Sequence, residues 1–281
     1  MDSFRAHHAD MADPAWQPSV EARLRDYGLV TFAGITDRAA LITIARRLMA
    51  IRTHRDAAAD GITEITEITE ITDRDTTAAG YAAFTDAELT PHTDGSSMPD
   101  PPGLLLLTCV QPASAGGATL LADGAQIITT LAARHPAALR SLSAPRAARF
   151  GADGGYLGSV FEPAGPDRLR IRLRLDDLVR FSADAATAIP SLRTAISRDL
   201  KTVHLGPGDS ILLCNTRWLH GRSPFNGHRT VLRILGDPLP AAGILPGFPA
   251  PQRASSAPRR TPGQWHLRNP RQADRLGEDN D

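Results

Sequence analysis

The sequence predicts an α+β fold that is mainly β, and three stretches of the chain carry this prediction. Residues 103–110 are a continuous apolar run, which is typical of a strand buried on both faces or in the core of a sandwich. Residues 168–175 alternate arginine with leucine or isoleucine, which is the period-two pattern of a strand. Residues 210–214 and 229–234 indicate two further strands that flank a polar connection.

Helices and a strand are expected at the start of the chain. A short helix is predicted between a capping Ser19 and a closing Gly28, and residues 29–32 read as a strand. A second helix is predicted to begin at Thr36, with apolar residues at helical spacing as far as Leu48. These elements are interpreted as scaffold.

Changes in composition divide the chain into three predicted regions. Residues 1–18 are expected to form an N-terminal arm, and residues 19–240 a single domain. Residues 241–281 are rich in proline, and the part from 251 onward carries six arginines and few apolar residues. We therefore expect a mostly unfolded tail there, with Trp265 as a docking point.

A short repeat interrupts the first half of the domain. Residues 61–72 read GITEITEITEIT, so Ile-Thr-Glu recurs with a period of three. This period matches neither a strand nor an α-helix. We interpret residues 61–80 as a surface insertion of which only the first copy, residues 61–65, is a strand; a mobile lid is the alternative.

The composition argues against several classes of protein. Lys+Arg and Asp+Glu both number 31, so there is no overall charge bias, and neither a nucleic-acid partner nor a membrane partner is expected. No apolar run has the length of a membrane span, and the first ten residues lack the apolar core of a signal peptide. Cys109 and Cys214 lie in apolar runs and read as buried thiols, which fits a reducing, cytoplasmic location.

The sequence Pro91-His92-Thr93-Asp94 contains the first candidate site. Side chains two residues apart in a strand point to the same side, so His92 and Asp94 would direct an imidazole and a carboxylate at one point. They would be two members of a 2-His-1-carboxylate face, which holds non-haem Fe(II) and leaves positions open. By itself the triplet is more simply a turn-proximal histidine and a strand-edge aspartate, so the downstream residues decide.

A glycine pair precedes the next candidate. Gly116 and Gly117 permit a close approach of the backbone, and Thr119 offers a hydroxyl within a short strand. Alone, Thr119 would be an ordinary strand residue. Asp123 is predicted to cap a helix that runs toward His135.

The arginine face of residues 168–175 has two interpretations. Most simply it is a solvated outer face; alternatively, one arginine turns into the site against an anionic substrate. The helix that follows is expected to have Pro190 in its first turn.

The second half of the candidate site lies between residues 206 and 233. The strand at 210–214 is followed by a segment that contains His220-Gly221, and then by a strand in which Arg229 and Arg233 share a face. Alone, His220 could be a turn residue and the arginines an exposed face. Their occurrence together, and in order with His92, Asp94 and Thr119, favours a functional site.

This constellation resembles the TauD/TfdA-like family of Fe(II)- and 2-oxoglutarate-dependent oxygenases, over about residues 20–240. The stretch His-Gly-Arg-Ser-Pro-Phe is similar to the clavaminate-synthase-like amino-acid hydroxylases of that superfamily. The family pattern is H-x-D/E, then G-G-x-T, then a distal histidine and a pair of arginines. The resemblance implies a double-stranded β-helix (jelly roll) core with flanking helices, and Fe(II), 2-oxoglutarate and O₂ as the reactive partners.

The resemblance also implies a role for each matching residue. His92, Asp94 and His220 would be the iron ligands, while Thr119 and Arg229 would bind the distal carboxylate of 2-oxoglutarate. Thr119 follows His92 by 27 residues, as the family pattern leads one to expect. A guanidinium can bind a carboxylate through two parallel hydrogen bonds, and a hydroxyl can satisfy a remaining lone pair.

Of the two arginines, Arg233 has a further implied role, and Arg229 departs from the spacing of the family pattern. Arg233 falls on the second family arginine, which often contacts an anionic group of the substrate. Arg229 follows His220 by nine residues, and the family gap is often a few residues longer. Arg222 and His228 are therefore the neighbours to compare with Arg229.

The predicted function is hydroxylation of a small metabolite, most readily an amino acid or another carboxylate-bearing compound, with conversion of 2-oxoglutarate to succinate; secondary metabolism would be the setting. Related halogenases have Gly or Ala in place of the carboxylate, so Asp94 favours hydroxylation, desaturation or ring closure. Sulfonates and phosphorylated compounds are the next candidate substrates. The alternative classes are a zinc hydrolase, which has no use for a carboxylate clamp, and a non-catalytic jelly-roll binding module, against which the intact ligand set argues.

Overall fold

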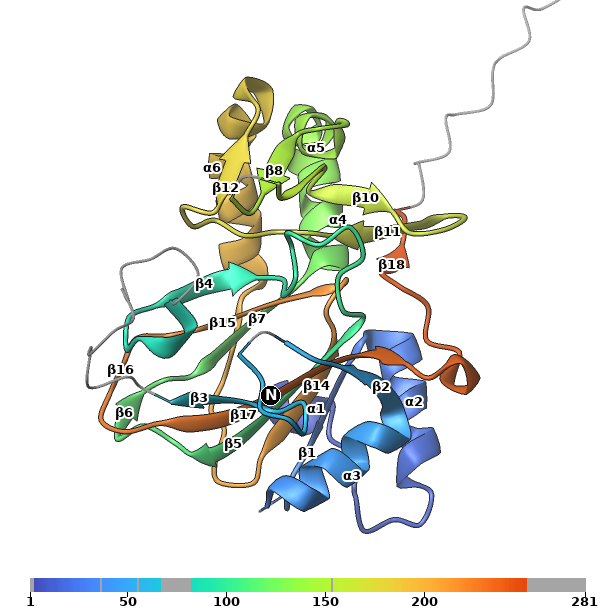
Figure 1. Ribbon diagram of the computed structural model, residues 1–281. Helices are drawn as coiled ribbons and strands as arrows, with labels where there is room; N and C mark the ends of the chain where they lie inside the picture. The colour runs from blue at the N-terminus through green and yellow to red at the C-terminus, as the bar shows by residue number, and fades with distance from the viewer. Residues whose placement is uncertain (1–2, 36, 55, 67–81, 153, 252–281) are drawn as a thin grey trace, which may run out of the picture. The chain divides into compact units, whose positions relative to one another are not determined.

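Two antiparallel sheets, one of six strands and one of four, lie at the centre of the protein (Figure 1). The computed structural model describes residues 3–35, 37–54, 56–66, 82–152 and 154–251. The larger sheet has the order β1-β14-β5-β17-β2, with β3 also paired to β17. Its strands are β1 (Leu29–Phe32), β2 (Met49–Arg52), β3 (Thr63–Thr66), β5 (Leu104–Gln111), β14 (Ser210–Cys214) and β17 (Thr230–Pro238). The smaller sheet has the order β13-β7-β15-β4, from β4 (Leu89–His92), β7 (Thr119–Asp123), β13 (Lys201–Val203) and β15 (Trp218–Arg222).

A hydrophobic core joins the two sheets. It contains buried side chains from both, namely Leu29, Leu105, Leu121, Val203, Ile211, Leu213, Trp218 and Leu235. Neighbouring side chains of β5 point to opposite faces, so Leu105 enters this core while Leu104 and Leu106 enter a second one on the outer face of the sheet. The apolar run at residues 103–110 is therefore buried on both faces, as predicted.

Two helices cover the outer face of the larger sheet. They are α2 (Trp16–Tyr27) and α3 (Arg38–Leu48), and their apolar sides share a core with β1, β5, β14 and β17. Gly28 ends α2 with a φ of +64°, as predicted, but the helix begins at Trp16 and not after Ser19. The side chain of Asp37 caps α3 by accepting a hydrogen bond from the Ala40 amide; Thr36 lies outside the described residues.

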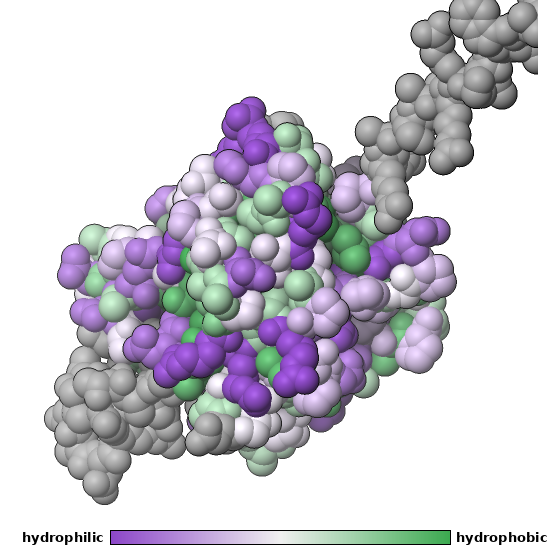
Figure 2. Space-filling model, turned by 90° about the horizontal axis from the view of Figure 1, so that it is seen from above, coloured by the Kyte–Doolittle hydropathy of each residue, from purple (hydrophilic) through white to green (hydrophobic). Residues whose placement is uncertain are grey.

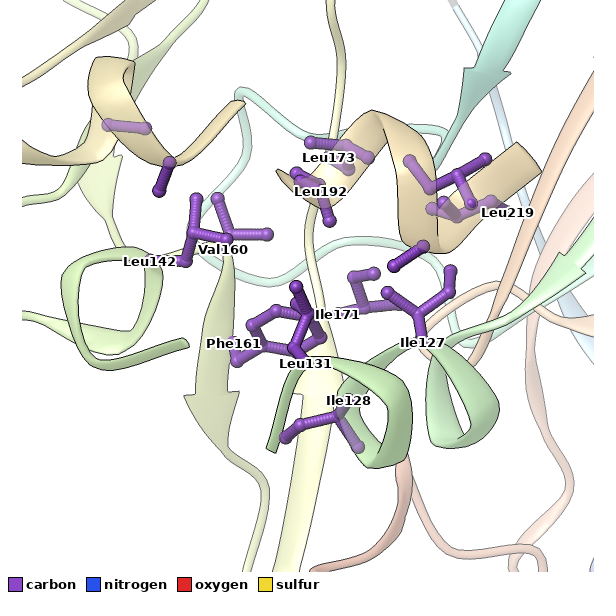
Figure 3. Close-up of a cluster of buried hydrophobic side chains, with 14 of the residues drawn as sticks. Ile127, Ile128, Leu131, Leu142, Val160, Phe161, Ile171, Leu173, Leu192 and Leu219 are labelled. Atoms are coloured by element: carbon purple, nitrogen blue, oxygen red, sulfur yellow. The ribbon is translucent and has the colours of Figure 1, made fainter. Parts of the chain in front are cut away.

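A second helical layer packs against the other end of the sheets (Figure 1). It comprises α4 (Gly124–Arg134), α5 (Pro136–Ser143) and α6 (Ala183–Asp199), and Asp123 caps α4 as predicted. Figure 3 shows their core, which contains Ile127 and Leu131 of α4, Leu192 of α6 and Leu219 of β15. The strand that carries His220 is thus anchored in this layer. The prediction for Pro190 was wrong, because α6 begins at Ala183 behind the cap Ser182 and Pro190 lies inside the helix.

Smaller elements complete the described chain. They are α1 (Ser3–Ala6), η1 (Ala82–Phe84), η2 (Pro240–Ala242), β6 (Ala115–Gly116), β8 (Ala148–Phe150), β9 (Tyr156–Gly158), β10 (Phe161–Pro163), β11 (Arg168–Ile171), β12 (Val179–Phe181), β16 (Phe225–Asn226) and β18 (Phe248–Pro249). The predicted strand at 168–175 therefore holds only to Ile171, and Arg172 beyond it is buried and not solvated.

The predicted arm, insertion and tail are described in part. Residues 3–18 include α1 and the first turn of α2, and the amide of Ala9 donates to the carbonyl of Thr31 in β1. The repeat enters the larger sheet as β3, whereas residues 67–81 lie outside the described residues. Of the predicted tail, residues 241–251 include β18, which pairs with β11; residues 252–281 lie outside.

The surface is chemically mixed, in keeping with the balanced charge. Hydrophilic and hydrophobic residues are interspersed over the face shown in Figure 2. Within the described ranges, no helix combines the length and the apolar character needed to cross a membrane.

Candidate metal centre and co-substrate pocket

The pairing of β4 with β15 brings the two candidate histidines together. His92 and His220 are direct partners in this antiparallel pair, and their ring centroids lie 4.4 Å apart. Gly221 permits the approach, because a Cβ at this position would lie 2.4 Å from the carbonyl oxygen of Leu89. His220 is therefore a strand residue and not a turn residue.

Asp94 completes a cluster of three potential ligands. One carboxylate oxygen lies 3.8 Å from Nε2 of His92, and the other lies 3.7 Å from Nε2 of His220. One ligand atom from each residue lies within 4.8 Å of the other two. Among the described residues, these three side chains form the one cluster of His, Cys, Asp or Glu whose spacing could hold a metal ion.

The protonation states of the cluster suit metal binding. Nδ1 of His92 lies 2.9 Å from the carbonyl oxygen of Thr90, which can only accept, so Nδ1 carries the proton and Nε2 has its lone pair free. Burial lowers the pKa of His92, and burial together with the neighbouring imidazole lowers the pKa of His220 to about 3. Burial opposes the ionisation of Asp94, but the charge of the neighbouring Arg233 guanidinium outweighs it and lowers the pKa of this carboxyl. Two neutral imidazoles and one carboxylate are the donor set preferred by Fe(II) sites with open positions.

Arg233 contacts the candidate centre directly. Its Nη1 lies 3.3 and 3.4 Å from the two oxygens of Asp94, and its Nη2 lies 3.4 Å from Nδ1 of His54. The side chain is mostly buried, yet it lines the cavity described below. This arginine can therefore orient the Asp94 carboxylate and also meet an anion in the cavity.

Arg229 and the glycine pair form a second feature. A Cβ on Gly117 would lie 3.2 Å from Cδ of Arg229, so the missing side chain leaves room for the arginine stem. Gly117 has a φ of +70°, a conformation that also favours glycine. Thr119 follows in β7 and is buried, opposite Arg222 of β15. The G-G-x-T motif thus lies against the stem of Arg229.

The Arg229 side chain is mostly buried. Burial lowers its pKa, and no residue within the described ranges accepts a hydrogen bond from it. A buried cation is unfavourable unless an anion or several acceptors meet it. The side chain is therefore suited to a carboxylate from outside the protein, such as that of 2-oxoglutarate.

The two neighbours of Arg229 are less suited to that role. The guanidinium of Arg222 donates to the carbonyl oxygens of Ala83, Thr85 and Ala87, at 3.1, 2.5 and 2.6 Å. His228 is exposed. The short spacing between His220 and Arg229 therefore does not shift the candidate role to either neighbour.

A cavity of about 730 Å³ opens beside the three candidate metal ligands. His92, Asp94 and Arg233 line it, whereas His220, Thr119 and Arg229 are not among its lining residues. Across the cavity, Arg174 donates to both carboxylate oxygens of Asp176, at 2.6 and 2.5 Å. Of the four arginines at 168–174, Arg174 is the one that lines the cavity, as the alternative interpretation of the sequence allowed.

Sequence reasoning missed the residues that hold this site in shape. Asn215 and Arg172 bind the backbone of the loop that follows Asp94, and Asp176 pairs with Arg174 at the cavity wall. Asn215 stood in the sequence at the end of an apolar strand, five residues before His220, and this was the only available signal.

Comparisons with known proteins give one family match and several similar folds. Residues 4–235 match the model of the taurine catabolism dioxygenase TauD, TfdA family. Human gamma-butyrobetaine dioxygenase is 26% identical over 184 residues, a match that covers 58% of this chain and 46% of the human protein. The chain thus spans less than half the length of that relative.

Solved structures share the fold. An asparagine oxygenase in complex with Fe(II), 2S,3S-3-hydroxyasparagine and succinate has a TM-score of 0.66 and 17% identity, and the match covers 80% of each chain. A non-heme iron oxygenase, OrfP, in complex with Fe and alpha-ketoglutaric acid has a TM-score of 0.58 and 17% identity, with 82% of this chain and 86% of that chain covered. Together with the two packed antiparallel sheets, these likenesses confirm the predicted jelly-roll fold class.

Proposed function

The chain belongs to the taurine catabolism dioxygenase TauD, TfdA family, and from this premise we propose that it is an Fe(II)- and 2-oxoglutarate-dependent oxygenase that hydroxylates a small amino acid or a similar carboxylate-bearing compound. The family membership bears out the resemblance noted in the sequence. The observation that carries the proposal is the convergence of His92 and His220, from the paired strands β4 and β15, with Asp94 from the turn that follows β4.

In this proposal the three residues hold Fe(II). The Nε2 atoms of His92 and His220 and the Asp94 carboxylate would be its ligands, leaving open positions on the side away from the protein donors. When bound, the iron supplies the activation of O₂ and the coupled decarboxylation of 2-oxoglutarate. The protein keeps the imidazoles neutral and the carboxylate charged; the Thr90 carbonyl orients the His92 ring, and Arg233 pairs with the Asp94 carboxylate.

Arg229 and Thr119 would hold the co-substrate. The guanidinium of Arg229, which meets no acceptor among the residues that the structure describes, would bind the distal carboxylate of 2-oxoglutarate through two hydrogen bonds, and the Thr119 hydroxyl would add another. Gly117 supports this assignment because its lack of a side chain leaves room for the arginine. Such a clamp has no purpose in a zinc hydrolase or in an empty binding module.

The cavity lining supports a substrate that carries both an acid and an ammonium group. Arg233 and Arg174 can bind a carboxylate, and Asp176 can bind an ammonium. Without substrate, Arg174 and Asp176 neutralise each other as an ion pair. A zwitterionic substrate would replace this pair with one ion pair to each residue. The hydroxylated asparagine in the similar structure is itself a zwitterion of this kind.

We also propose that the protein works in a reducing compartment such as the cytoplasm. Cys109 and Cys214 are free and buried, and burial raises the pKa of the Cys214 thiol to about 12. A thiol with a pKa so far above neutrality is chemically inert, which fits a packing role.

A metabolite screen tests the proposal. The full chain is incubated with Fe(II), 2-oxoglutarate, O₂ and a panel of free amino acids, and mass spectrometry follows products that gain one oxygen as succinate forms. We expect one or a few amino acids to stimulate succinate release and to be hydroxylated. Succinate release that stays absent with every substrate, despite bound iron, would contradict the proposed function.

Arg174 and Asp176 can be tested in the same assay. Arg174→Ala and Asp176→Asn should raise the KM for the hydroxylated amino acid about tenfold or more, because each removes a charged hydrogen bond. The KM for 2-oxoglutarate should stay the same. Equal effects on both KM values would show that these residues do not select the substrate.

A further inference from the structure

Asn215, the residue directly after β14, binds both ends of the loop that begins at Asp94. Its Oδ1 accepts a hydrogen bond from the Asp94 amide at 2.8 Å, and its Nδ2 donates to the carbonyl oxygens of Asp94 and Pro102, both at 2.9 Å. The side chain is completely buried. One amide group therefore satisfies three backbone groups and fixes the main chain on both sides of the Asp94 Cα.

Asn215 is itself rigidly placed. Its backbone amide donates to the carbonyl oxygen of Gly103 at 3.0 Å, next to the start of β5. It lies five residues before His220, so one short segment carries one candidate ligand and holds the backbone of another. The relative positions of His220 and Asp94 thus depend on this segment.

The middle of the same loop is held by Arg172. Its Nη1 donates to the carbonyl oxygens of Ser96 and Met98, at 2.7 and 2.5 Å, and its Nη2 donates to that of Pro99 at 3.2 Å. The guanidinium also stacks on Tyr156, with Cζ 3.9 Å from the ring centroid. The loop that leads away from Asp94 is therefore held at its ends by Asn215 and at its centre by Arg172.

We propose that Asn215 is a positioning residue that sets the direction of the Asp94 carboxylate toward the metal, with Arg172 as its support. This inference rests on the proposed function, because it takes Asp94 to be a metal ligand. Asparagine suits the position because its side chain provides one acceptor and two donors. Aspartate would lack the two donors and add a buried charge, and alanine would leave three backbone groups unsatisfied.

The test compares Asn215→Ala with a matched control, Thr108→Val. Thr108 is also buried and hydrogen-bonds Ser210 at 2.9 Å between β5 and β14, but it touches none of the three candidate ligands. Both variants lose buried hydrogen bonds, so both should be less stable than the wild type. Only Asn215→Ala should change the metal site.

The main readout is the affinity of the full chain for Fe(II), titrated anaerobically, with the rise in thermal midpoint on metal addition as a second measure. Replacing residues that orient a ligand typically costs about 10–100-fold in metal affinity. We expect a loss in this range for Asn215→Ala and less than about threefold for Thr108→Val. If Asn215→Ala does not fold, Asn215→Ser keeps one hydroxyl partner and should still lose about tenfold.

The outcomes separate the inference from the proposed function. If the wild type binds Fe(II) and the Asn215 variants bind it within threefold as tightly, the positioning role is overturned and the oxygenase proposal is untouched. An equal loss in Thr108→Val would also overturn it, since general destabilisation would then account for the effect. If the wild type itself binds no Fe(II), the proposed function fails, and the positioning role fails with it.

Discussion

His92 and His220 are register partners across β4 and β15, so the candidate centre is built into the hydrogen-bond ladder of the smaller sheet. The chain separation between the two histidines is large, but their spatial separation is set by a single strand pair. The distance between the rings therefore depends on how closely the two strands approach, and Gly221 controls that approach.

Gly221→Ala should weaken metal binding without removing a ligand. The added methyl would lie 2.4 Å from the Leu89 carbonyl oxygen, so β4 must move away from β15 and take His92 with it. Overpacking of this kind costs about 1–3 kcal/mol of unfolding free energy. Urea unfolding and Fe(II) titration measure the two effects.

Gly206→Ala is the matched control for this change. A Cβ there would meet only the carboxylate oxygen of Asp209, at 3.3 Å. This variant should keep the Fe(II) affinity of the wild type. If Gly221→Ala also keeps it, the close approach of the strands does not determine the site.

Asp94→Ala should abolish iron binding and hydroxylation, because it removes the only carboxylate of the cluster. Since replacing a residue that merely orients a ligand costs about 10–100-fold, loss of a ligand should cost at least about 100-fold in affinity. Iron content and succinate release measure the outcome. Asp100→Ala, whose carboxylate is 80% exposed and pairs with Arg52, is the control. Undiminished succinate release by Asp94→Ala would reject the ligand assignment.

Arg229→Ala should sharply raise the concentration of 2-oxoglutarate that is needed. Loss of one partner of a buried charge pair costs about 3–5 kcal/mol, which corresponds to a rise in KM of more than 100-fold. Arg140→Ala, an exposed arginine on α5, should leave this KM unchanged. A rise of less than about threefold in Arg229→Ala would indicate that another arginine binds the co-substrate.

The metal-free protein should lose stability on acidification. The pKa of His220 is about 3 in the folded protein, against 6.5 for the free side chain. Between these values the unfolded chain holds a proton that the folded chain does not, so stability present above pH 6.5 is lost as the pH falls. From pH 7 to pH 5 this single group contributes a loss of about 2 kcal/mol.

His220→Gln provides the comparison for this pH effect, because it keeps a polar side chain that cannot titrate. Urea unfolding in the presence of a chelator, at pH 7 and pH 5, measures both proteins. The variant should lose less stability than the wild type over this interval. Equal losses would mean that His220 takes up no proton on unfolding.

The strands and the spacing of the candidate ligands were predictable because they depend on local pattern. Apolar runs located β5 and β14, the pattern at residues 229–234 located part of β17, period-two alternation located β11, and the H-x-D spacing singled out His92 and Asp94 as candidates. The capping roles of Gly28 and Asp123 were also visible, since each depends on one residue and its immediate neighbours.

Features that depend on tertiary contacts were not predictable. The alternation at residues 168–175 continues past Ile171, but Arg172 is turned inward because distant carbonyl groups of the loop at 96–99 need donors. Pro190 was taken for a helix start, whereas the helix tolerates it in its interior. The role of Asn215 requires knowing that Asp94 and Pro102 meet it in space.

The hydrogen bonds from Arg222 to residues 83–87 bear on how many copies of the Ile-Thr-Glu repeat the chain can carry. The start of the Ile-Thr-Glu repeat is paired to β17 as β3, and after the repeat three carbonyl groups shortly before β4 accept hydrogen bonds from Arg222. A variant with one Ile-Thr-Glu triplet more or fewer is therefore expected to keep the Fe(II) affinity of the wild type, provided that β3 and residues 83–87 keep these contacts.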